Sequence, residues 1–202
     1  MPTEILPLVL AAVLGYLCGS IPFGLILTGA AGLGDIRSIG SGNIGATNVL
    51  RTGNKKIAAA TLVLDALKAV VPILLARYFW GEDAARLAAI GAFWGHCFPV
   101  WLNFKGGKGV AVMIGSTLAL SWPVGLIFCA VWLLIAFTRK ISSLAALTAA
   151  ATAPIFAYVF NGERLALVVA GLSLLLFFQH RENIGRLLKG TEPTIGGNKK
   201  AG

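Results

Sequence analysis

The sequence predicts an all-α, polytopic integral membrane protein with about seven transmembrane helices. Three observations carry this prediction: 57% of the 202 residues are hydrophobic, only 12% are charged, and apolar runs of roughly membrane-spanning length recur along the whole chain. A soluble domain has about 25% charged residues, so this chain has about half the usual charge to present to water. Apolar runs of about 20 residues suit helices that cross a bilayer.

Short charged segments divide the apolar runs into seven expected spans. These cover residues 5–29, 57–78, 85–103, 109–120, 123–138, 143–160 and 164–180. The fourth span is short, with about twelve residues where about 20 are normal, so it crosses at a tilt, lies in thin membrane or stops partway. We expect a single transmembrane domain over residues 1–192, followed by a mobile cytoplasmic tail over residues 193–202 that is rich in glycine and lysine.

The basic residues predict the orientation, because Lys and Arg beside spans accumulate on the cytoplasmic side. With the N-terminus outside and seven crossings, the outer side holds only Arg77, Arg86 and Arg164. If the fourth segment did not cross, the later segments would change sides and the bias would disappear. We therefore expect an inner-membrane protein with its N-terminus out and its C-terminus in. The net charge of +9 then reflects topology and phosphate or anionic-lipid binding rather than nucleic acid.

Charged and thiol side chains also occur within the spans. Asp65 and Lys68 share a helix face in the second span, and an unpaired charge there would cost several kcal/mol. A structural ion pair is the favoured interpretation, with a direct role as the alternative. Cys18, Cys97 and Cys129 have no metal-ligand spacing, so we expect buried thiols, no metal site and no cofactor.

The first of three polar segments on the expected inner side reads GSGNIGATNVLR and begins at Gly40. It contains a GxGxxG pattern, but a dinucleotide site also needs a βαβ unit, which the flanking spans exclude. Glycines still let the backbone approach an anion closely. Neutral donors and one bidentate cation surround them: Ser41, Asn43, Thr47, Asn48 and Arg51.

The second polar segment, GHCFPVWLNFKGGKG, ends in a loop of lysines and glycines. Lys105 and Lys108 bracket Gly106 and Gly107. The loop is not a Walker A sequence, because no Ser or Thr follows Lys108. It does lie at the start of the fourth expected helix, where the helix dipole attracts anions. Phosphate binding is therefore favoured over a plain basic loop that only sets topology.

The third polar segment, QHRENIGRLLKGTE, follows the last span. A basic amphipathic tail on the membrane surface is one interpretation, but it leaves four residues unexplained: His180, Asn183, Arg186 and Glu192. Ser142 and Ser143 form a fourth polar cluster on the same side. These segments carry many cations and few carboxylates, so the natural ligand is anionic and can carry more than one phosphate.

Three motifs in order resemble the bacterial membrane acyl-phosphate:glycerol-3-phosphate acyltransferase family (PlsY): GSGNIGATNVLR, GHCFPVWLNFKGGKGVA and HRENIGRLLKGTE. The resemblance covers nearly the whole chain. It implies transfer of a fatty acyl group from acyl phosphate to the sn-1 hydroxyl of glycerol 3-phosphate, giving lysophosphatidic acid and phosphate. It also implies a role for one residue pair in each motif: Ser41 and Arg51 as essential residues, Gly106 and Gly107 as the acyl phosphate site, and Asn183 and Glu192 as residues needed for activity or integrity.

The general base is left open by the sequence. Thioester-dependent acyltransferases often place an Asp five residues after a His base, but Trp101 follows His96 and Gly185 follows His180 at that spacing. No GxSxG elbow is present either. The base is then either His180 or the donor's own phosphate, whose second pKa is about 6. We take four residues as catalytic: Ser41, Arg51, His180 and Asn183.

A membrane carrier for an organic phosphate is the main alternative function. It would share a cationic site facing the membrane interior. Carriers of this kind often show two repeated halves, and the sequence shows none. The partners expected for the enzyme are acyl phosphate, glycerol 3-phosphate and membrane lipid.

Overall fold

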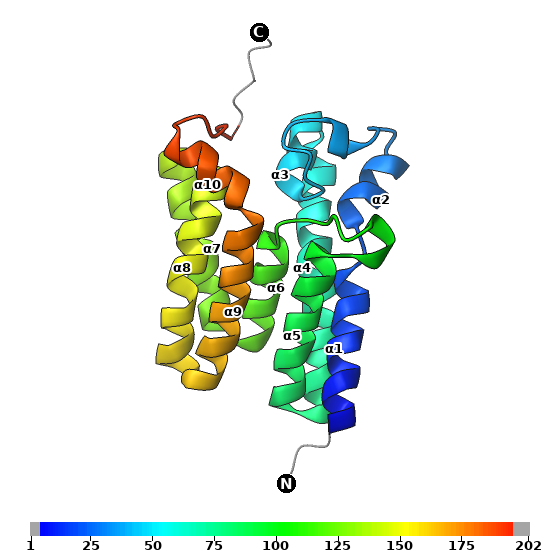
Figure 1. Ribbon diagram of the computed structural model, residues 1–202, viewed down its shortest axis with the longest axis vertical. Coiled ribbons are helices and arrows are strands. Elements are labelled where there is room, and N and C mark those ends of the chain that lie inside the picture. Colours follow the sequence, from blue (N-terminus) through cyan, green and yellow to red (C-terminus); the bar gives the residue numbers. More distant parts are fainter. Residues whose placement is uncertain (1–4, 196–202) are drawn as a thin grey trace. The chain divides into compact units, whose positions relative to one another are not determined.

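The computed structural model describes residues 5–195, and this part of the chain is helical with no strand (Figure 1). Its elements in order are α1 (Ile5–Gly19), α2 (Phe23–Ala30), η1 (Ile36–Ser38), α3 (Ala46–Val49), η2 (Leu50–Thr52), α4 (Lys55–Trp80), α5 (Glu82–Cys97), η3 (Val100–Leu102), α6 (Val110–Leu120), α7 (Trp122–Arg139), α8 (Ser142–Asn161), α9 (Glu163–Gln179) and α10 (Arg181–Leu188). The all-α prediction is confirmed for these residues. Most of the expected tail, residues 196–202, lies outside them.

Each of the seven expected spans contains at least one α-helix, and these helices differ in length. By length and composition, four segments can cross a membrane: Ile5–Ala30, Lys55–Trp80, Trp122–Arg139 and Ser142–Asn161. The pair α9 and α10, bent by 63°, makes a fifth if the two helices are counted as one span. The 16 residues of α5 and the 11 of α6 would extend only about 24 Å and 16 Å, against a hydrocarbon core of about 30 Å.

The described residues fall into two compact units, divided between Gly125 and Leu126. In the first unit α1, α4 and α5 run side by side (Figure 1), and α6 packs along α4. In the second unit α8 packs along α9, and α10 turns away from the end of α9. The first two polar segments belong to the first unit, and the third belongs to the second.

Local sequence explains where the long helix α4 begins and ends. Asn54 is its N-cap, and its Oδ1 accepts a 3.1 Å hydrogen bond from the Ile57 N–H, which satisfies a backbone donor that has no partner within the helix. Gly81 ends α4 with a φ of 85°, a conformation that favours glycine. Pro72 lies inside α4 without ending it, as membrane helices allow.

Small residues bring α1 and α5 into backbone contact. On α1, a Cβ at Gly15 or Gly19 would overlap the backbone of Ala88 or Ala92. On α5, Gly91 and Gly95 meet the backbone of α1 in the same way. Both helices therefore present two glycines four residues apart, an arrangement that allows close helix packing where lipid gives no hydrophobic drive.

The first expected span is not one continuous helix. It is interrupted at Ser20, Ile21 and Pro22, between α1 and α2. Proline lacks a backbone N–H and disfavours the helical conformation of the residue before it. The interruption frees backbone carbonyls, which accept hydrogen bonds from side chains. The Trp101 Nε1–H donates to the Ser20 carbonyl at 2.7 Å, and Lys68 Nζ donates to the Ile21 carbonyl at 2.7 Å.

Candidate functional site

Asn48 organises the first polar segment. It is 1% exposed, and its Nδ2 donates to the carbonyls of Ile36 and Ile39 at 2.7 and 3.2 Å. Its Oδ1 accepts from the backbone N–H of Ser41 and from Arg51 Nη1, both at 3.1 Å. The sequence analysis placed Asn48 among the substrate-binding residues, and the structure makes it the side chain that shapes the loop.

The other predicted residues of this segment lie nearer the surface. Ser41, Thr47 and Arg51 are exposed, so their polar atoms can meet a ligand. Asn43 is half-buried, and its Oδ1 accepts a 2.8 Å hydrogen bond from the Gly45 N–H at the start of α3. Gly40 has a φ of 58°, and a Cβ there would overlap Asn48 and Arg51.

A small apolar core holds this segment in place. Ile44 and Val49 of the segment are buried with Ile36 and Ala58. Leu102 of the second segment packs against the same core. The first two polar segments are therefore joined by packing inside the first unit.

In the second segment, the glycines lie against the end of α5. The Gly106 N–H donates to the Cys97 carbonyl and the Gly107 N–H to the His96 carbonyl, both at 3.0 Å. A Cβ at Gly106 would overlap the His96 carbonyl, and one at Gly107 would overlap the His96 ring. The sequence analysis assigned these glycines to close approach by a ligand, which stays a prediction. The protein atoms nearest to a Cβ at either glycine belong to His96 of α5.

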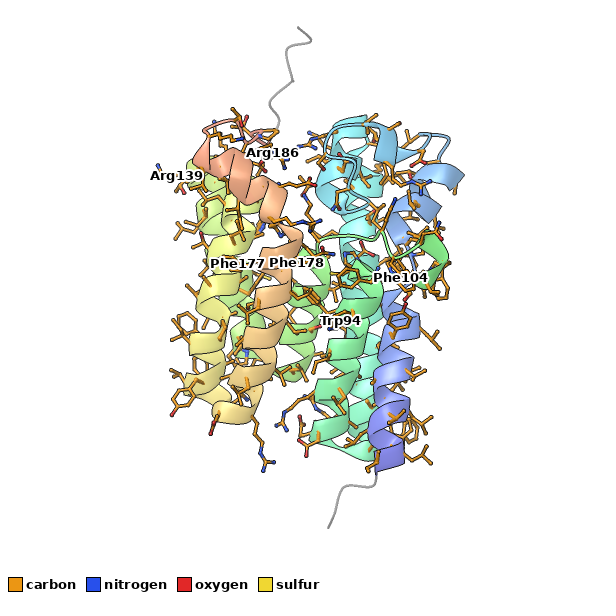
Figure 2. The ribbon with its side chains drawn as sticks, in the orientation of Figure 1. Trp94, Phe104, Arg139, Phe177, Phe178 and Arg186 are labelled. Atoms are coloured by element: carbon orange, nitrogen blue, oxygen red, sulfur yellow. The ribbon has the colours of Figure 1, made fainter. Side chains whose placement is uncertain are left out.

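Two lysines of this loop come just before the start of α6. Lys105 is exposed and Lys108 is half-buried. Gly109, with a φ of 88°, is the N-cap of α6, and the first N–H groups of a helix have no partner within it. Just before the lysines, Asn103 and Phe104 have φ values of 50° and 60°, and Phe104 is 58% exposed (Figure 2).

Glu192 organises the third polar segment. Its Oε1 accepts from Ser143 Oγ at 2.7 Å and from Asn183 Nδ2 at 2.6 Å. Its Oε2 accepts from Arg186 Nε at 2.6 Å. The structure thus brings together four residues that the sequence analysis placed in the site, from α8, α10 and the segment after α10.

The environment of Glu192 favours its charged form. Partial burial pushes the pKa of this carboxyl upward, but the hydrogen bonds from Ser143, Asn183 and Arg186 and the charge of Arg186 outweigh burial, so the pKa lies below its ordinary value. Both oxygens are occupied by protein donors. Glu192 therefore acts here as a scaffold for the side chains around it, and it neutralises one cation of the segment.

His180 forms the bend between α9 and α10. It is 3% exposed, and its Nδ1 lies 2.9 Å from the Leu176 carbonyl. A carbonyl can only accept, so Nδ1 carries a proton and donates it to this contact. Ser142 is half-buried at the start of α8. Figure 2 shows Arg139 and Arg186 at the same end of this unit.

Some residues that shape these segments were missed by the sequence analysis. The backbone N–H of Ile195 donates to the Lys140 carbonyl at 2.7 Å, which ties the end of the third segment to the α7–α8 turn. Trp101 and Tyr16 also donate to backbone carbonyls near the α1–α2 interruption. The spacing of small residues on α1 and α5 could have predicted their close packing. No sequence pattern predicts these contacts to backbone carbonyls.

These features define an α-helical integral membrane protein whose polar loops carry cations, amides and hydroxyls. The chain belongs to the glycerol-3-phosphate acyltransferase family, whose model matches residues 9–190. It is 62% identical over 189 residues to a glycerol-3-phosphate acyltransferase of Rhodopseudomonas palustris, covering 94% of this chain and 96% of that protein. It is 59% identical over 189 residues to that of Mesorhizobium japonicum, with the same coverage.

Two solved structures share the fold. Both are crystal structures of PlsY, an integral membrane glycerol 3-phosphate acyltransferase. The glycerol 3-phosphate form is 37% identical with a TM-score of 0.88, and the lysophosphatidic acid form is 35% identical with a TM-score of 0.84. Each comparison covers 93% of this chain and 94% of the other.

Proposed function

We propose that this protein transfers a fatty acyl group from acyl phosphate to the sn-1 hydroxyl of glycerol 3-phosphate. The observation that carries the proposal is the pair of related structures, named for glycerol 3-phosphate and for lysophosphatidic acid. These two molecules differ by one acyl group, so they are the acceptor and the product of one O-acylation. Acyl phosphate as the donor follows from the three sequence motifs.

The reaction forms one carbon–oxygen bond, breaks another and moves one proton. The acceptor hydroxyl oxygen bonds to the acyl carbon, and the bond between that carbon and the phosphate oxygen breaks. The hydroxyl proton leaves with inorganic phosphate, and lysophosphatidic acid remains. Because both substrates carry phosphate, the site must hold two anions close together, which requires several cations and N–H donors.

The first two segments supply donors and cations for these anions. Arg51 offers a planar fork for a phosphate, and its bond to Asn48 fixes one of its terminal nitrogens. Ser41, Thr47 and Asn43 add neutral donors. Lys105 and Lys108, with the N-terminus of α6, add positive charge that a phosphate can use.

The third segment supplies a second set of donors. Arg186 uses Nε for Glu192, and its guanidinium has further N–H donors for a phosphate. Asn183 uses Nδ2 for Glu192 and has a carbonyl oxygen to orient a hydroxyl. Ser142 and Ser143 add hydroxyls at the start of α8. His180 contributes its Nε2, as a hydrogen-bonding group or as a base.

We assign the general base to the donor's phosphate. An acyl phosphate has a second pKa of about 6, so its dianion can take the hydroxyl proton near neutral pH. The protein then contributes positioning and charge stabilisation. This assignment suits polar segments in which the carboxylate of Glu192 already accepts from three protein donors.

The protein's placement in the membrane follows from its charge distribution. We infer seven crossings in one domain over residues 1–192, with the N-terminus outside and all three polar segments at the cytoplasmic side of the inner membrane. The asymmetric distribution of Lys and Arg supports this orientation. The short helices α5 and α6 then need neighbouring helices or thin membrane to complete their crossings.

One assay tests the proposed function. Purified protein in detergent is given acyl phosphate and glycerol 3-phosphate, and both released phosphate and acylated product are measured. An acyltransferase releases one phosphate for each lysophosphatidic acid formed. A carrier or a lipid-binding scaffold gives neither product, and phosphate release without acylated glycerol 3-phosphate would contradict the assignment of the acceptor.

A further inference from the structure

Lys68 and Asp65 form the most deeply buried ion pair in the described part of the chain. Lys68 Nζ lies 2.6 Å from Asp65 Oδ1, and the two side chains are 2% and 4% exposed. A buried ion pair is seldom more stabilising than an apolar pair of the same volume. Stability alone therefore does not explain why two charges lie in the middle of α4.

The ammonium of Lys68 has a second partner outside its own helix. It donates a 2.7 Å hydrogen bond to the carbonyl of Ile21, which is one of the groups released by the interruption between α1 and α2. The same carbonyl accepts the Phe23 N–H at 3.1 Å, and the Phe23 ring lies 5.9 Å from Nζ. Lys68 therefore holds the residues from which α2 begins.

The helix α2 in turn holds the first polar segment. Gly24, one residue after Phe23, approaches the carbonyl of Ile44 so closely that a Cβ would overlap it. A Cβ at Gly24 would also come within 3.4 Å of the Thr61 side chain of α4. Because Ile44 lies between Asn43 and Gly45 in the polar loop, a shift of α2 would move that loop.

The same interruption is also joined to the second polar segment. Trp101 donates to the Ser20 carbonyl, and the Tyr16 hydroxyl donates to the Phe98 carbonyl at 2.9 Å. Lys68 is thus linked to both anion-binding loops of the first unit.

We propose that Lys68, oriented by Asp65, is a positioning residue that fixes the α1–α2 interruption and thereby the geometry of the first two polar segments. Its side chain is too deeply buried to bind a ligand presented at the exposed loops, so it acts through the Ile21 carbonyl. The proposal rests on the acyltransferase function proposed above. In this role Asp65 holds the Lys68 ammonium on the Ile21 carbonyl. An apolar side chain at position 68 would remove this hydrogen bond.

The decisive variant replaces the pair by apolar side chains of similar size. Asp65→Leu/Lys68→Met should fold with a Tm at least equal to that of the wild type, because the desolvated charges are gone. Its kcat/KM should nevertheless fall by about 10- to 100-fold, because small misplacements of binding groups have effects of this size. Its pH–rate profile should keep its shape, and the Phe23 amide should exchange hydrogen faster.

A second ion pair provides the matched control. Asp83 and Arg86 pair at the same i, i+3 spacing near the start of α5, but they do not contact the interruption. Asp83→Leu/Arg86→Met should leave kcat/KM unchanged. A similar loss of activity in this control would show that removing any ion pair lowers kcat/KM, and the proposal for Lys68 would fail.

Other outcomes also decide the question. Wild-type kcat/KM in the apolar variant would overturn the proposal, and a displaced pH–rate profile would replace positioning by a direct proton role. If the apolar variant does not fold, the single variants Asp65→Asn and Lys68→Gln are compared with each other. Asp65→Asn keeps the ammonium on the Ile21 carbonyl, so it should retain more activity than Lys68→Gln. Equal or reversed activities would overturn the proposal. An inactive wild type would instead contradict the proposed function.

Discussion

Ser143, at the start of α8, donates a 2.7 Å hydrogen bond to Glu192, 49 residues later in the chain. Asn183 and Arg186 of α10 donate to the same carboxylate. One negative charge therefore connects three segments that each carry predicted site residues. The connection depends on the charged form of Glu192, which makes it sensitive to acid.

The pKa of Glu192 lies below its ordinary value of 4.5, which fixes the direction of the pH effect. A carboxyl with a lower pKa in the folded protein stabilises the fold at pH values above its unfolded pKa, and this stabilisation is lost as the pH falls through the folded pKa. Glu192→Gln should lower the free energy of unfolding by about 1–3 kcal/mol at pH 7. The difference should shrink below about pH 4.5.

Thermal unfolding in detergent at pH 7 and pH 4 measures this effect. Glu182→Gln is the matched control, because Glu182 lies on the same helix α10 but is exposed. The control should unfold like the wild type at both pH values. A Glu192→Gln protein as stable as the control at pH 7 would show that the carboxylate does not hold the segments together.

Arg51→Lys should lose most activity while the protein still folds. Lysine keeps the charge but cannot copy a planar fork that binds a phosphate at two points, so we expect kcat/KM to fall by about 10- to 100-fold. Arg37→Lys is the control, since Arg37 pairs with Asp35 on the surface. Near-normal turnover of the Arg51 variant would remove Arg51 from the site.

Gly107→Ala should disturb the loop through His96. The added Cβ would overlap the imidazole, and the expected result is a lower kcat/KM together with lower stability. His96→Ala removes the obstructing ring, so Gly107→Ala should be less damaging in that background, and a double-mutant cycle measures the coupling. An unchanged stability with a raised KM for acyl phosphate alone would instead support direct ligand contact at Gly107.

The helices could be predicted from apolar runs, but the interruption of the first one could not be predicted from Pro22 alone. Pro72 and Pro154 lie inside continuous helices, so proline in an apolar run does not by itself end a helix in a membrane. Pro22 differs because Trp101 and Lys68 donate hydrogen bonds to the backbone carbonyls released beside it. Those partners are distant in sequence.

The polar segments could be found from composition, whereas the role of each side chain could not. Asn43 and Asn48 are equivalent as neutral donors in the sequence, yet Asn43 forms a local turn and Asn48 is a buried hub for four groups. The motif marked Glu192 only as needed for activity or integrity, and its partners come from segments that no local pattern connects. Burial and long-range contacts decide both cases.

Labelling from outside the cell tests the orientation. In a variant lacking Cys18, Cys97 and Cys129, a cysteine at Asp83 should react with an impermeant thiol reagent, and one at Lys56 should react only after permeabilisation. Lys199, the natural choice near the C-terminus, lies outside the described residues. Labelling in the reverse pattern would overturn the proposed orientation.

His180→Gln tests the source of the base. Glutamine can still donate to the Leu176 carbonyl but cannot accept a proton near neutral pH, so the variant should retain measurable turnover if the donor's phosphate is the base. Its pH profile should still report a group near about 6. His96→Asn should behave likewise. A folded His180→Gln enzyme about 10³-fold slower, with no titration near 6, would make His180 the base.

The glycine contact between α1 and α5 also sets a step size for movement between these helices. Each backbone carries its glycines four residues apart, so a sliding helix regains a fitting neighbour only after about 6 Å. Smaller displacements press Cβ atoms onto backbone. Gradual sliding of α1 along α5 is therefore disfavoured, and a substrate-driven shift between these two helices would proceed by a jump of about one turn.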